Sequence, residues 1–328
     1  MSYVVDCHNH VVPPEAVAAL QRDGNPFEAT VRGRLVEHHD GIAFPLAAEM
    51  DDVEAKLASL DRRRIDAAIV SPSPTLLGCN HPAEQALEAS RLLNDGLLGM
   101  VAQAPDRLRP MAAIPLQDPE AAAGEAARMH AKGVRSIMVG TFATGWRLGQ
   151  ASLRPFWREV ERLELLVLLH PFFVGTKPGM EQHYLTNLVG NPLETATAMA
   201  DIVLSGLVEE CPRLRLLLAH GGGFAPYQFG RWRHGHRVRE EVRTDSPRDP
   251  AEYLGAFYYD TITHSPEALE FLVRWAGPER VLLGTDLPFD MADDDPVGTV
   301  DSVRLTTPER RAVLAGNALA LLGEARED

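Results

Sequence analysis

The feature that most constrains the fold of this chain is a regular alternation of short apolar segments with longer amphipathic ones. Eight segments of four to six residues are mainly apolar, and stretches with apolar residues at helical spacing separate them. Apolar strands that alternate with helices are typical of a parallel sheet covered by helices. The predicted strands are residues 3–7, 66–71, 109–114, 134–139, 165–169, 214–219, 257–261 and 281–284.

Several of the predicted helices begin with a polar residue followed by proline and an early glutamate. The polar side chain can accept a hydrogen bond from a free helix N–H, and proline is tolerated at the first helical position. The glutamate suits the positive end of the helix dipole. We expect helix starts at Asp118-Pro119-Glu120, Asn191-Pro192-Leu193-Glu194, Ser265-Pro266-Glu267 and Thr307-Pro308-Glu309.

Eight strand–helix units can form a closed (β/α)8 TIM barrel or an open doubly wound sheet. The open sheet is disfavoured because no Gly-rich loop follows the first predicted strand. Candidate ligand residues follow strands one, five, six and eight, and these ends meet at one mouth only in a barrel. In an open sheet they would be several strand widths of about 4.8 Å apart. We therefore predict an α/β fold, a (β/α)8 TIM barrel.

We expect residues 1–328 to form a single domain, because this length fits one barrel of about 250 residues plus insertions. The polar segment 21–50 lies between the first strand and a helix predicted at 51–63. It is predicted to be a small insertion over the barrel mouth. A second irregular segment, 291–300, contains three consecutive aspartates, and we expect an exposed loop there rather than a cation site.

The composition excludes several classes of partner. A net charge of -14 argues against binding to nucleic acid or to an anionic membrane. Cys7, Cys79 and Cys211 have no paired spacing, which indicates a reducing compartment rather than a disulfide framework. No signal-type segment precedes the first strand, and no apolar run approaches the roughly 18 residues that span a bilayer. We predict a cytoplasmic protein.

Metal-type side chains occur at the ends of the predicted strands. His8 and His10 alternate along the first strand, so both imidazoles point to the same face. His170 follows the fifth strand and Asp286 the eighth. Three imidazoles and one carboxylate leave a coordination position open, as in a catalytic rather than a structural metal site.

One divalent metal ion is therefore predicted, with Zn2+ preferred. Mn2+, Fe2+ or Co2+ would accept the same donor set. No lysine follows the predicted strand 134–139, so a carbamylated lysine that bridges two metal ions is not expected.

His220 follows the sixth strand and begins the sequence His220-Gly221-Gly222-Gly223. The glycines allow the backbone to approach a substrate closely. A histidine beside a metal site has a pKa suited to general acid–base catalysis. The alternatives are that His220 is a further metal ligand or a hydrogen-bonded core residue.

These motifs resemble the amidohydrolase-superfamily decarboxylases related to 2-amino-3-carboxymuconate-6-semialdehyde decarboxylase. The ordered set is specific, whereas the His-x-His pair alone is weak, and the resemblance spans nearly the whole chain. It rests on His8-Asn9-His10, His170-Pro171, His220-Gly221-Gly222-Gly223, Gly284-Thr285-Asp286-Leu287-Pro288-Phe289, Gly230-Arg231, His234-Gly235, Tyr253-Leu254-Gly255, His264 and Gly316-Asn317-Ala318-Leu319.

The resemblance implies an amidohydrolase-like barrel with one metal ion held by His8, His10, His170 and Asp286. It implies His220 as the catalytic acid–base residue, acting beside Asp286. Members of the family are commonly homodimers, and the counterpart of Arg231 meets the substrate carboxylate in the neighbouring subunit. The alternative for the basic stretch around Arg231 is a solvated helix face.

The chain departs from that family at the substrate pocket. The arginine that holds the substrate ahead of the first helix is missing, and Phe44 is at its place. The expected tryptophan near Asn187 is also missing. We expect Phe44, Asn187 and Arg231 to bind the substrate, with Arg32 or Arg34 as possible replacements for the arginine.

The predicted activity is metal-dependent, non-oxidative decarboxylation of an aromatic or unsaturated, muconate-semialdehyde-like carboxylic acid. The first alternative is a metal-dependent hydrolase or hydratase that acts on a lactone, an amide or an activated alkene. The second is a non-catalytic metal-binding barrel with a regulatory role. The open coordination position and the glycine run argue against the second alternative.

Overall fold

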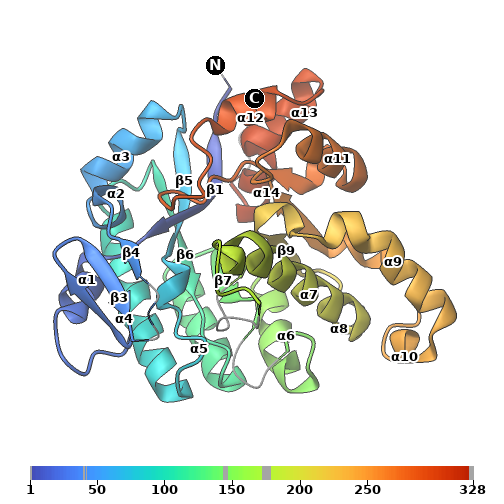
Figure 1. Cartoon of the computed structure of the whole chain (residues 1–328), viewed down its shortest axis with the longest axis horizontal. Helices are drawn as coiled ribbons and strands as arrows, with labels where there is room; N and C mark the ends of the chain where they lie inside the picture. The colour runs from blue at the N-terminus through green and yellow to red at the C-terminus, as the bar shows by residue number, and fades with distance from the viewer. Residues whose placement is uncertain (1, 40, 42, 143–146, 172–178, 325–328) are drawn as a thin grey trace.

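The centre of the molecule is a parallel sheet of eight strands in the order β1-β5-β6-β7-β8-β9-β10-β11, surrounded by helices (Figure 1). The computed structural model describes residues 2–39, 41, 43–142, 147–171 and 179–324. The sheet closes between its first and last strands, where Cys7 N donates to Leu283 O at 2.9 Å and His10 N donates to Leu287 O at 2.7 Å. The predicted (β/α)8 barrel is confirmed. All eight predicted strands are present.

The barrel strands lie within a few residues of the predicted segments. They are β1 (Val5–Val11), β5 (Ala67–Pro72), β6 (Leu108–Ala113), β7 (Ser136–Gly140), β8 (Leu166–His170), β9 (Arg215–Leu218), β10 (Phe257–Asp260) and β11 (Val281–Leu282). The α-helices are α1 (Pro14–Leu20), α2 (Ala48–Asp51), α3 (Val53–Arg62), α4 (Ala83–Val101), α5 (Pro119–Ala131), α6 (Arg154–Arg162), α7 (Asn191–Leu204), α8 (Leu207–Glu210), α9 (Ala225–Val238), α10 (Glu240–Arg243), α11 (Pro266–Ala276), α12 (Pro296–Asp301), α13 (Thr307–Arg311) and α14 (Asn317–Leu322).

Alternation along the strands divides the core into two layers. On β8, Val167 and Leu169 pack outward in the large cluster between the sheet and the helices. Leu166 and Leu168 belong to the separate cluster inside the barrel. Because successive side chains of a strand point to opposite faces, His170 continues the inward series and ends it at the mouth.

β1 contains a bulge directly before its histidines. Asp6 pairs with Ala68 of β5 but Asn9 pairs with Val70, so three steps along β1 match two along β5. One extra residue on β1 reverses which face each later side chain occupies.

The bulge explains how β1 places consecutive side chains on one side of the sheet. Val5 and Cys7 lie in the cluster inside the barrel. After the bulge His8 and His10 also face the barrel axis, while Val11 packs outward. The histidine pair therefore points to the barrel interior because of the bulge.

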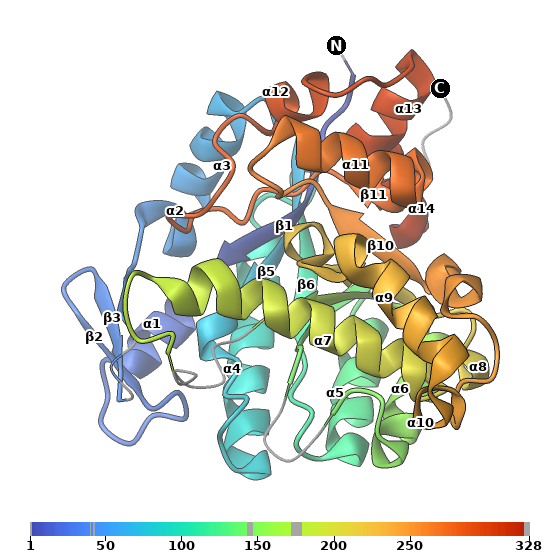
Figure 2. The ribbon, with the colours of Figure 1, turned by 45° about the vertical axis from the view of Figure 1, so that its right-hand side comes forward.

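The segment between β1 and α3 forms a separate antiparallel sheet of β2 (Ala29–Arg32), β3 (Leu35–His38) and β4 (Ala43–Pro45). This sheet lies at one edge of the molecule beside α1 (Figure 2). Its inner side chains, among them Phe27, Val36 and Phe44, form a third apolar cluster with α1 and α4.

The predicted helix starts are confirmed at two positions. The side chains of Asp118 and Ser265 accept hydrogen bonds from the first turns of α5 and α11. For α13 the cap is Thr306, which forms a capping box with Glu309, one residue earlier than predicted.

The expectation that Asn191 caps α7 is wrong. A turn of π-helix, η3 (Thr186–Gly190), leads directly into α7, so the first N–H groups of α7 already have helical partners. The side chain of Asn191 therefore remains available for another contact. In the described parts of the chain, no helix has the length and apolar character needed to cross a bilayer.

Candidate metal centre

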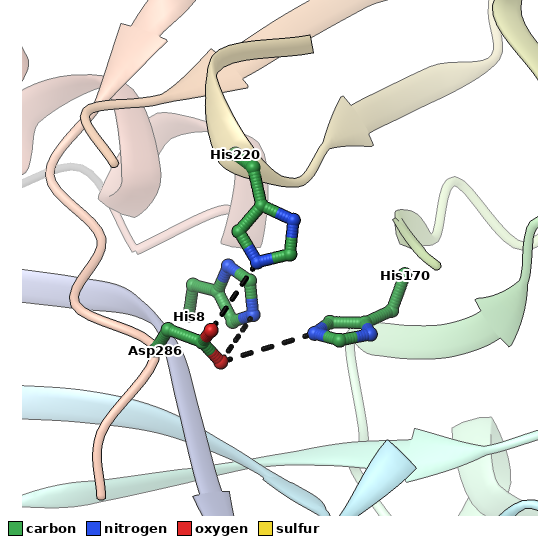
Figure 3. Close-up of side chains that lie close together, drawn as sticks. All are labelled: His8, His170, His220 and Asp286. Atoms are coloured by element: carbon green, nitrogen blue, oxygen red, sulfur yellow. Dashed lines mark hydrogen bonds and ion pairs between the residues drawn. The ribbon is translucent and has the colours of Figure 1, made fainter. Parts of the chain in front are cut away.

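Five side chains from four strand ends meet at the mouth of the barrel, and Figure 3 shows four of them, His8, His170, His220 and Asp286. His8 and His10 lie on β1, His170 ends β8, His220 follows β9 and Asp286 follows β11. The Nε2 atoms of His8 and His10 are 3.1 Å apart. Asp286 Oδ1 lies 3.0 Å from His10 Nε2, 3.4 Å from His8 Nε2 and 3.9 Å from His170 Nε2. Asp286 Oδ2 lies 3.2 Å from His220 Nε2.

Hydrogen bonds on the outer nitrogens orient the rings. His8 Nδ1 donates to Asp260 Oδ2 at 2.8 Å, and His170 Nδ1 donates to the carbonyl oxygen of Pro171 at 2.8 Å. A carboxylate and a carbonyl can only accept, so both protons are on Nδ1. The Nε2 atoms of both rings consequently point to the centre of the cluster.

These residues fit a divalent cation. His10 Nδ1 contacts Ser71 Oγ at 2.9 Å, so its Nε2 also faces inward. His170 Nε2 is buried and has no hydrogen-bond partner among the residues that the structure describes. Ligand atoms of His8, His170, His220 and Asp286 all lie within 4.8 Å of one another. Lone pairs that face each other at 3.1 Å repel unless a proton or a metal ion lies between them.

The burial of the histidine rings and the charge of the nearby carboxylates together favour one positive charge at the centre of the ligand cluster. Burial lowers the pKa of His10 to about 4 and that of His170 to about 3, so both rings are neutral. Burial also opposes a charge on His8, but the carboxylates of Asp286 and Asp260 raise its pKa to about 10. The pKa of Asp286 is held well below its usual range, against the effect of burial, by the four histidines around it. A cation would replace the proton of His8.

His220 is attached to the cluster through a constrained backbone. Its φ of 56° and the φ of 61° at Asp286 are in the left-handed region, where non-glycine residues are strained. Asp260 fixes the local geometry, because its carboxylate accepts from His220 N at 2.9 Å and from Gly221 N at 2.7 Å. One carboxylate thus orients both His8 and the His220 loop.

The glycines after His220 are required by the packing. All three have positive φ. A Cβ at Gly221 would lie 2.9 Å from Thr263 Cγ2, and one at Gly222 would lie 2.8 Å from Tyr259 Cδ1. Both contacts are too close for an alanine, so the loop needs glycine at these positions.

A cavity of about 740 Å³ opens beside His220 and Asp286. Besides these two residues it is lined by the start of α7, the glycine loop, the start of α9, the loop before α11 and one face of α11. Among the predicted substrate-binding residues, Asn187 lies in its wall.

The other two predicted substrate-binding residues do not line this cavity. Phe44 is buried and packs on Phe289 with a centroid distance of 6.0 Å, and Phe289 in turn lies 5.3 Å from the ring of His10. Arg231 lies on the exposed face of α9. Arg34, a possible replacement for the missing arginine, forms a two-point ion pair with Asp51 instead.

Sequence analysis missed two buried aspartates behind the site. Asp260 ends β10, and its position at a strand end was a usable signal. Asp6 precedes the bulge and accepts from His8 N, Asn9 Nδ2 and both the N and Oγ1 of Thr285. No sequence feature distinguished Asp6 from a surface residue.

Comparisons with known proteins agree with this geometry. The chain is 30% identical to 2-amino-3-carboxymuconate-6-semialdehyde decarboxylase of Dictyostelium discoideum, over 98% of this chain and 92% of that protein. It is 31% identical to the gamma-resorcylate decarboxylase of Rhodococcus jostii strain RHA1, over 74% of this chain and 78% of that protein. Among solved structures, a dihydroxybenzoic acid decarboxylase from Polaromonas sp. JS666 has a TM-score of 0.82 at 22% identity.

That Polaromonas structure covers 100% of this chain and 98% of its own, and it contains manganese and the inhibitor 2-nitroresorcinol. The family model described as amidohydrolase matches residues 5–323. With the barrel and the His/Asp metal site, this match shows that the chain belongs to the amidohydrolase family.

Proposed function

We propose that this chain is a metal-dependent, non-oxidative carboxy-lyase that acts on a small aromatic or unsaturated carboxylic acid. The observation that carries the proposal is the position of His220, which lines the cavity and lies beside the buried ligand cluster. A proton donor and a cation site thus face one cavity. The decarboxylase names of the relatives above support the same reaction class.

The proposed metal ligands are His8, His10, His170 and Asp286, with Zn2+ as the preferred ion. A divalent ion bound there would supply Lewis acidity that polarises the substrate. Mn2+, Fe2+ or Co2+ fit the same donors, and the Polaromonas relative contains manganese. Metal analysis of the purified protein is expected to give one ion per chain.

His220 carries the proton transfer. Its Nε2 donates a proton to the substrate carbon that bears the carboxylate, and this carbon becomes tetrahedral. The bond to the carboxylate then breaks, its electron pair returns to the ring or double bond, and carbon dioxide leaves. His220 recovers a proton from solvent. Asp286, whose Oδ2 lies 3.2 Å from His220 Nε2, holds the imidazole at the wall of the cavity.

Replacement of His220 tests this role. His220→Ala should lower kcat by at least about 10²-fold, the usual contribution of one positioned proton donor, while one metal ion per chain is retained. Carbon dioxide release would be measured with aromatic and muconate-type acids, and metal content by mass spectrometry. Loss of the metal in this variant would instead make His220 a ligand, and a hydrolysis or hydration product without carbon dioxide would contradict the decarboxylase.

The substrate carboxylate needs a cationic partner besides the metal, and we propose Arg231 of a second protomer in a homodimer. Arg231 is exposed on α9 and forms no ion pair with any residue that the structure describes, whereas its neighbour Arg233 is paired with Asp249 at 2.7 Å. A guanidinium group suits two-point recognition of a carboxylate.

Subunit complementation tests the proposed dimer. Arg231→Ala and His220→Ala should each be nearly inactive alone. In a mixed dimer of the two variants one of the two composite sites is complete, so mixed dimers should regain up to about half of the wild-type activity per chain, and an unseparated one-to-one mixture about a quarter. Absence of recovery in confirmed mixed dimers would place Arg231 outside the neighbouring site.

Asn187 lies in the proposed pocket, and Phe44 acts from behind it. Asn187 offers an amide in the cavity wall, and Phe44 supports Phe289 against His10. We propose a cytoplasmic location because the cysteines of the sequence have no paired spacing, which suits a reducing compartment. With a net charge of -14, a small carboxylate rather than nucleic acid or a membrane is the proposed partner.

A further inference from the structure

The cavity extends well beyond the metal centre. From His220 and Asp286 it runs outward between the start of α7, the start of α9 and one face of α11. The views in Figures 1 and 2 place α9 beside both α7 and α11, on one side of the barrel mouth. We call the outer part the side groove, and define it by Leu188, Phe224, Tyr227, Ala268, Phe271 and Leu272.

The size of the cavity exceeds the needs of one aromatic ring. About 740 Å³ lies in the upper part of the range of roughly 300–1,000 Å³ that holds drug-sized ligands. Next to His220 the lining includes Gly221 and Gly223, which carry no side chains and leave room between the centre and the groove. A substrate held at the metal therefore has open space on this side.

The chemistry of the side groove is apolar and unsuited to a second anion. No lysine or arginine is among the residues that line the cavity, and its carboxylates are Asp286 at the centre and Glu267 near the outer end. A second carboxylate on the substrate would meet these like charges, and among the described lining residues His264 is the one basic side chain besides His220. The six residues of the groove offer aliphatic and aromatic contacts instead.

The outer end of the groove exposes large apolar side chains. Tyr227 is 80% exposed and Phe271 40%, and their ring centroids are 6.5 Å apart. Leu188 and Phe224 are exposed beside them at 48% and 41%. A contiguous apolar surface of this kind, continuous with a catalytic cavity, indicates a ligand site.

We infer that the preferred substrate has one carboxylate at the metal and an uncharged apolar arm, alkyl or aryl, that occupies the side groove. This inference rests on the proposed decarboxylase and narrows its substrate class. It favours extended aromatic acids over dicarboxylic muconate-type acids. The arm leaves the ring on the side opposite the carboxylate, because the groove leads away from the ligand cluster.

A graded series of acids tests the inference. The probes are 2,6-dihydroxybenzoic acid and its 4-propyl, 4-pentyl and 4-carboxymethyl derivatives, with the metal-loaded enzyme. Each methylene that enters the groove should raise kcat/KM about threefold to fourfold, and the 4-carboxymethyl acid should be the poorest substrate. Calorimetry of the same acids gives their affinities independently of turnover.

A matched pair of variants locates the effect. Ala268 is exposed on α11 and lines the groove, so Ala268→Trp fills the groove without disturbing the core. For this variant, kcat/KM of the 4-pentyl acid divided by kcat/KM of the parent acid should be at least tenfold lower than for the wild type. Arg274→Trp, on the same helix but outside the cavity, should leave that ratio unchanged.

The outcomes separate the inference from the proposed function. If no acid releases carbon dioxide but affinity still rises with chain length, the decarboxylase fails and the groove stands. If carbon dioxide is released and neither kcat/KM nor affinity depends on chain length, the groove assignment is overturned. The groove assignment is also overturned if Tyr227→Ser dissociates a dimer but leaves the dependence of kcat/KM on chain length intact. The exposed rings of Tyr227 and Phe271 would then belong to a subunit interface.

Discussion

At the scale of single residues, Asp260 connects the metal centre to the proton donor. Its Oδ2 accepts both from His8 Nδ1 at 2.8 Å and from His220 N at 2.9 Å, and its Oδ1 accepts from Gly221 N. Burial raises the pKa of Asp260, but the hydrogen bond and charge of His8 outweigh burial and leave it below its ordinary value. The carboxylate is therefore ionised and acts only as an acceptor.

Asp260→Asn replaces the carboxylate, which accepts through both oxygens, by an amide and leaves the volume of the side chain nearly unchanged. Ile262 N also donates to Asp260 Oδ1 at 3.1 Å, and the amide must turn an N–H toward one or more of these donors, so at least one of the four hydrogen bonds is lost. We expect metal affinity to fall about 10- to 100-fold, as for other partners of metal-bound histidines. Competition with a chelator measures this affinity, and Asp249→Asn, a surface change that removes the ion pair with Arg233, serves as the control. An unchanged metal affinity would mean that Asp260 orients only the His220 loop and does not support the metal ligand His8.

Lys56 is a buried cation behind the histidine pair. Its Nζ donates to Asn9 Oδ1 at 2.6 Å and to the carbonyl oxygen of His10 at 2.9 Å, while Glu49 lies 4.0 Å away. Burial lowers its pKa from 10.5 to about 8, although Glu49 opposes the change. The folded state therefore holds the Lys56 proton less strongly than the unfolded state does.

This difference predicts a pH dependence. Below about pH 8 both states bind the Lys56 proton, and between about 8 and 10.5 the unfolded state binds more. The Lys56 contribution to the free energy of unfolding therefore increases with pH across this window, by about 3 kcal/mol in total. Denaturant titrations would measure the free energies of unfolding of the wild type and of Lys56→Met across this pH window. The difference between the two should change by the same amount. A constant difference across the window would contradict the prediction.

At the scale of elements, the bulge in β1 decides where the first two ligands point. The bulge is held by Asp6, which accepts from His8 N at 3.0 Å and from Thr285 Oγ1 at 2.6 Å. Thr285 directly precedes Asp286, so one buried carboxylate ties β1 to the segment after β11. The relative position of the His8 and Asp286 ligands depends on this connection.

Asp6→Ala is expected to loosen both the fold and the site. Four hydrogen bonds to a buried acceptor are lost, and the unpaired donors cost roughly 1–3 kcal/mol each when they stay dry. We predict a decrease of several kcal/mol in the free energy of unfolding, together with weaker metal binding. Denaturation and metal titration of the same samples measure the two effects. Thr306→Ala, which removes a distant cap worth about 1 kcal/mol, should reduce stability and leave metal affinity unchanged.

The elements also show what the sequence could and could not predict. Alternation on β8 was sufficient to place His170 at the mouth, because that strand is regular. The residue spacing of His8 and His10 predicted a shared face, but which face depends on a bulge that arises only from pairing with β5. Asn191 has the composition of a helix cap, yet the preceding π-helical turn determines its role. Pairing with the distant β5 therefore decided the orientation of the histidine pair, and the backbone directly before Asn191 decided the role of that residue.

At the scale of the whole molecule, the metal site is where the ends of the closed sheet meet. β1 and β11 are adjacent in the barrel although they lie at opposite ends of the chain. His8 and His10 come from one and Asp286 follows the other, while His170 comes from the far side of the barrel. An ion bound by all four therefore joins segments that separate when the barrel opens.

This arrangement predicts that metal removal destabilises the entire barrel rather than one loop. Metal binds the folded state only, so an ion at 100 times its Kd adds about 2.7 kcal/mol to the free energy of unfolding. For a chain of this size each kcal/mol shifts Tm by roughly 1.5 °C, so stripping should lower Tm by roughly 4 °C. Calorimetry before and after chelation, with Zn2+ or Mn2+ restored, measures the shift. His170→Ala should show a reduced metal response, and an equal Tm in the stripped and loaded wild type would mean that the ion does not bridge the barrel.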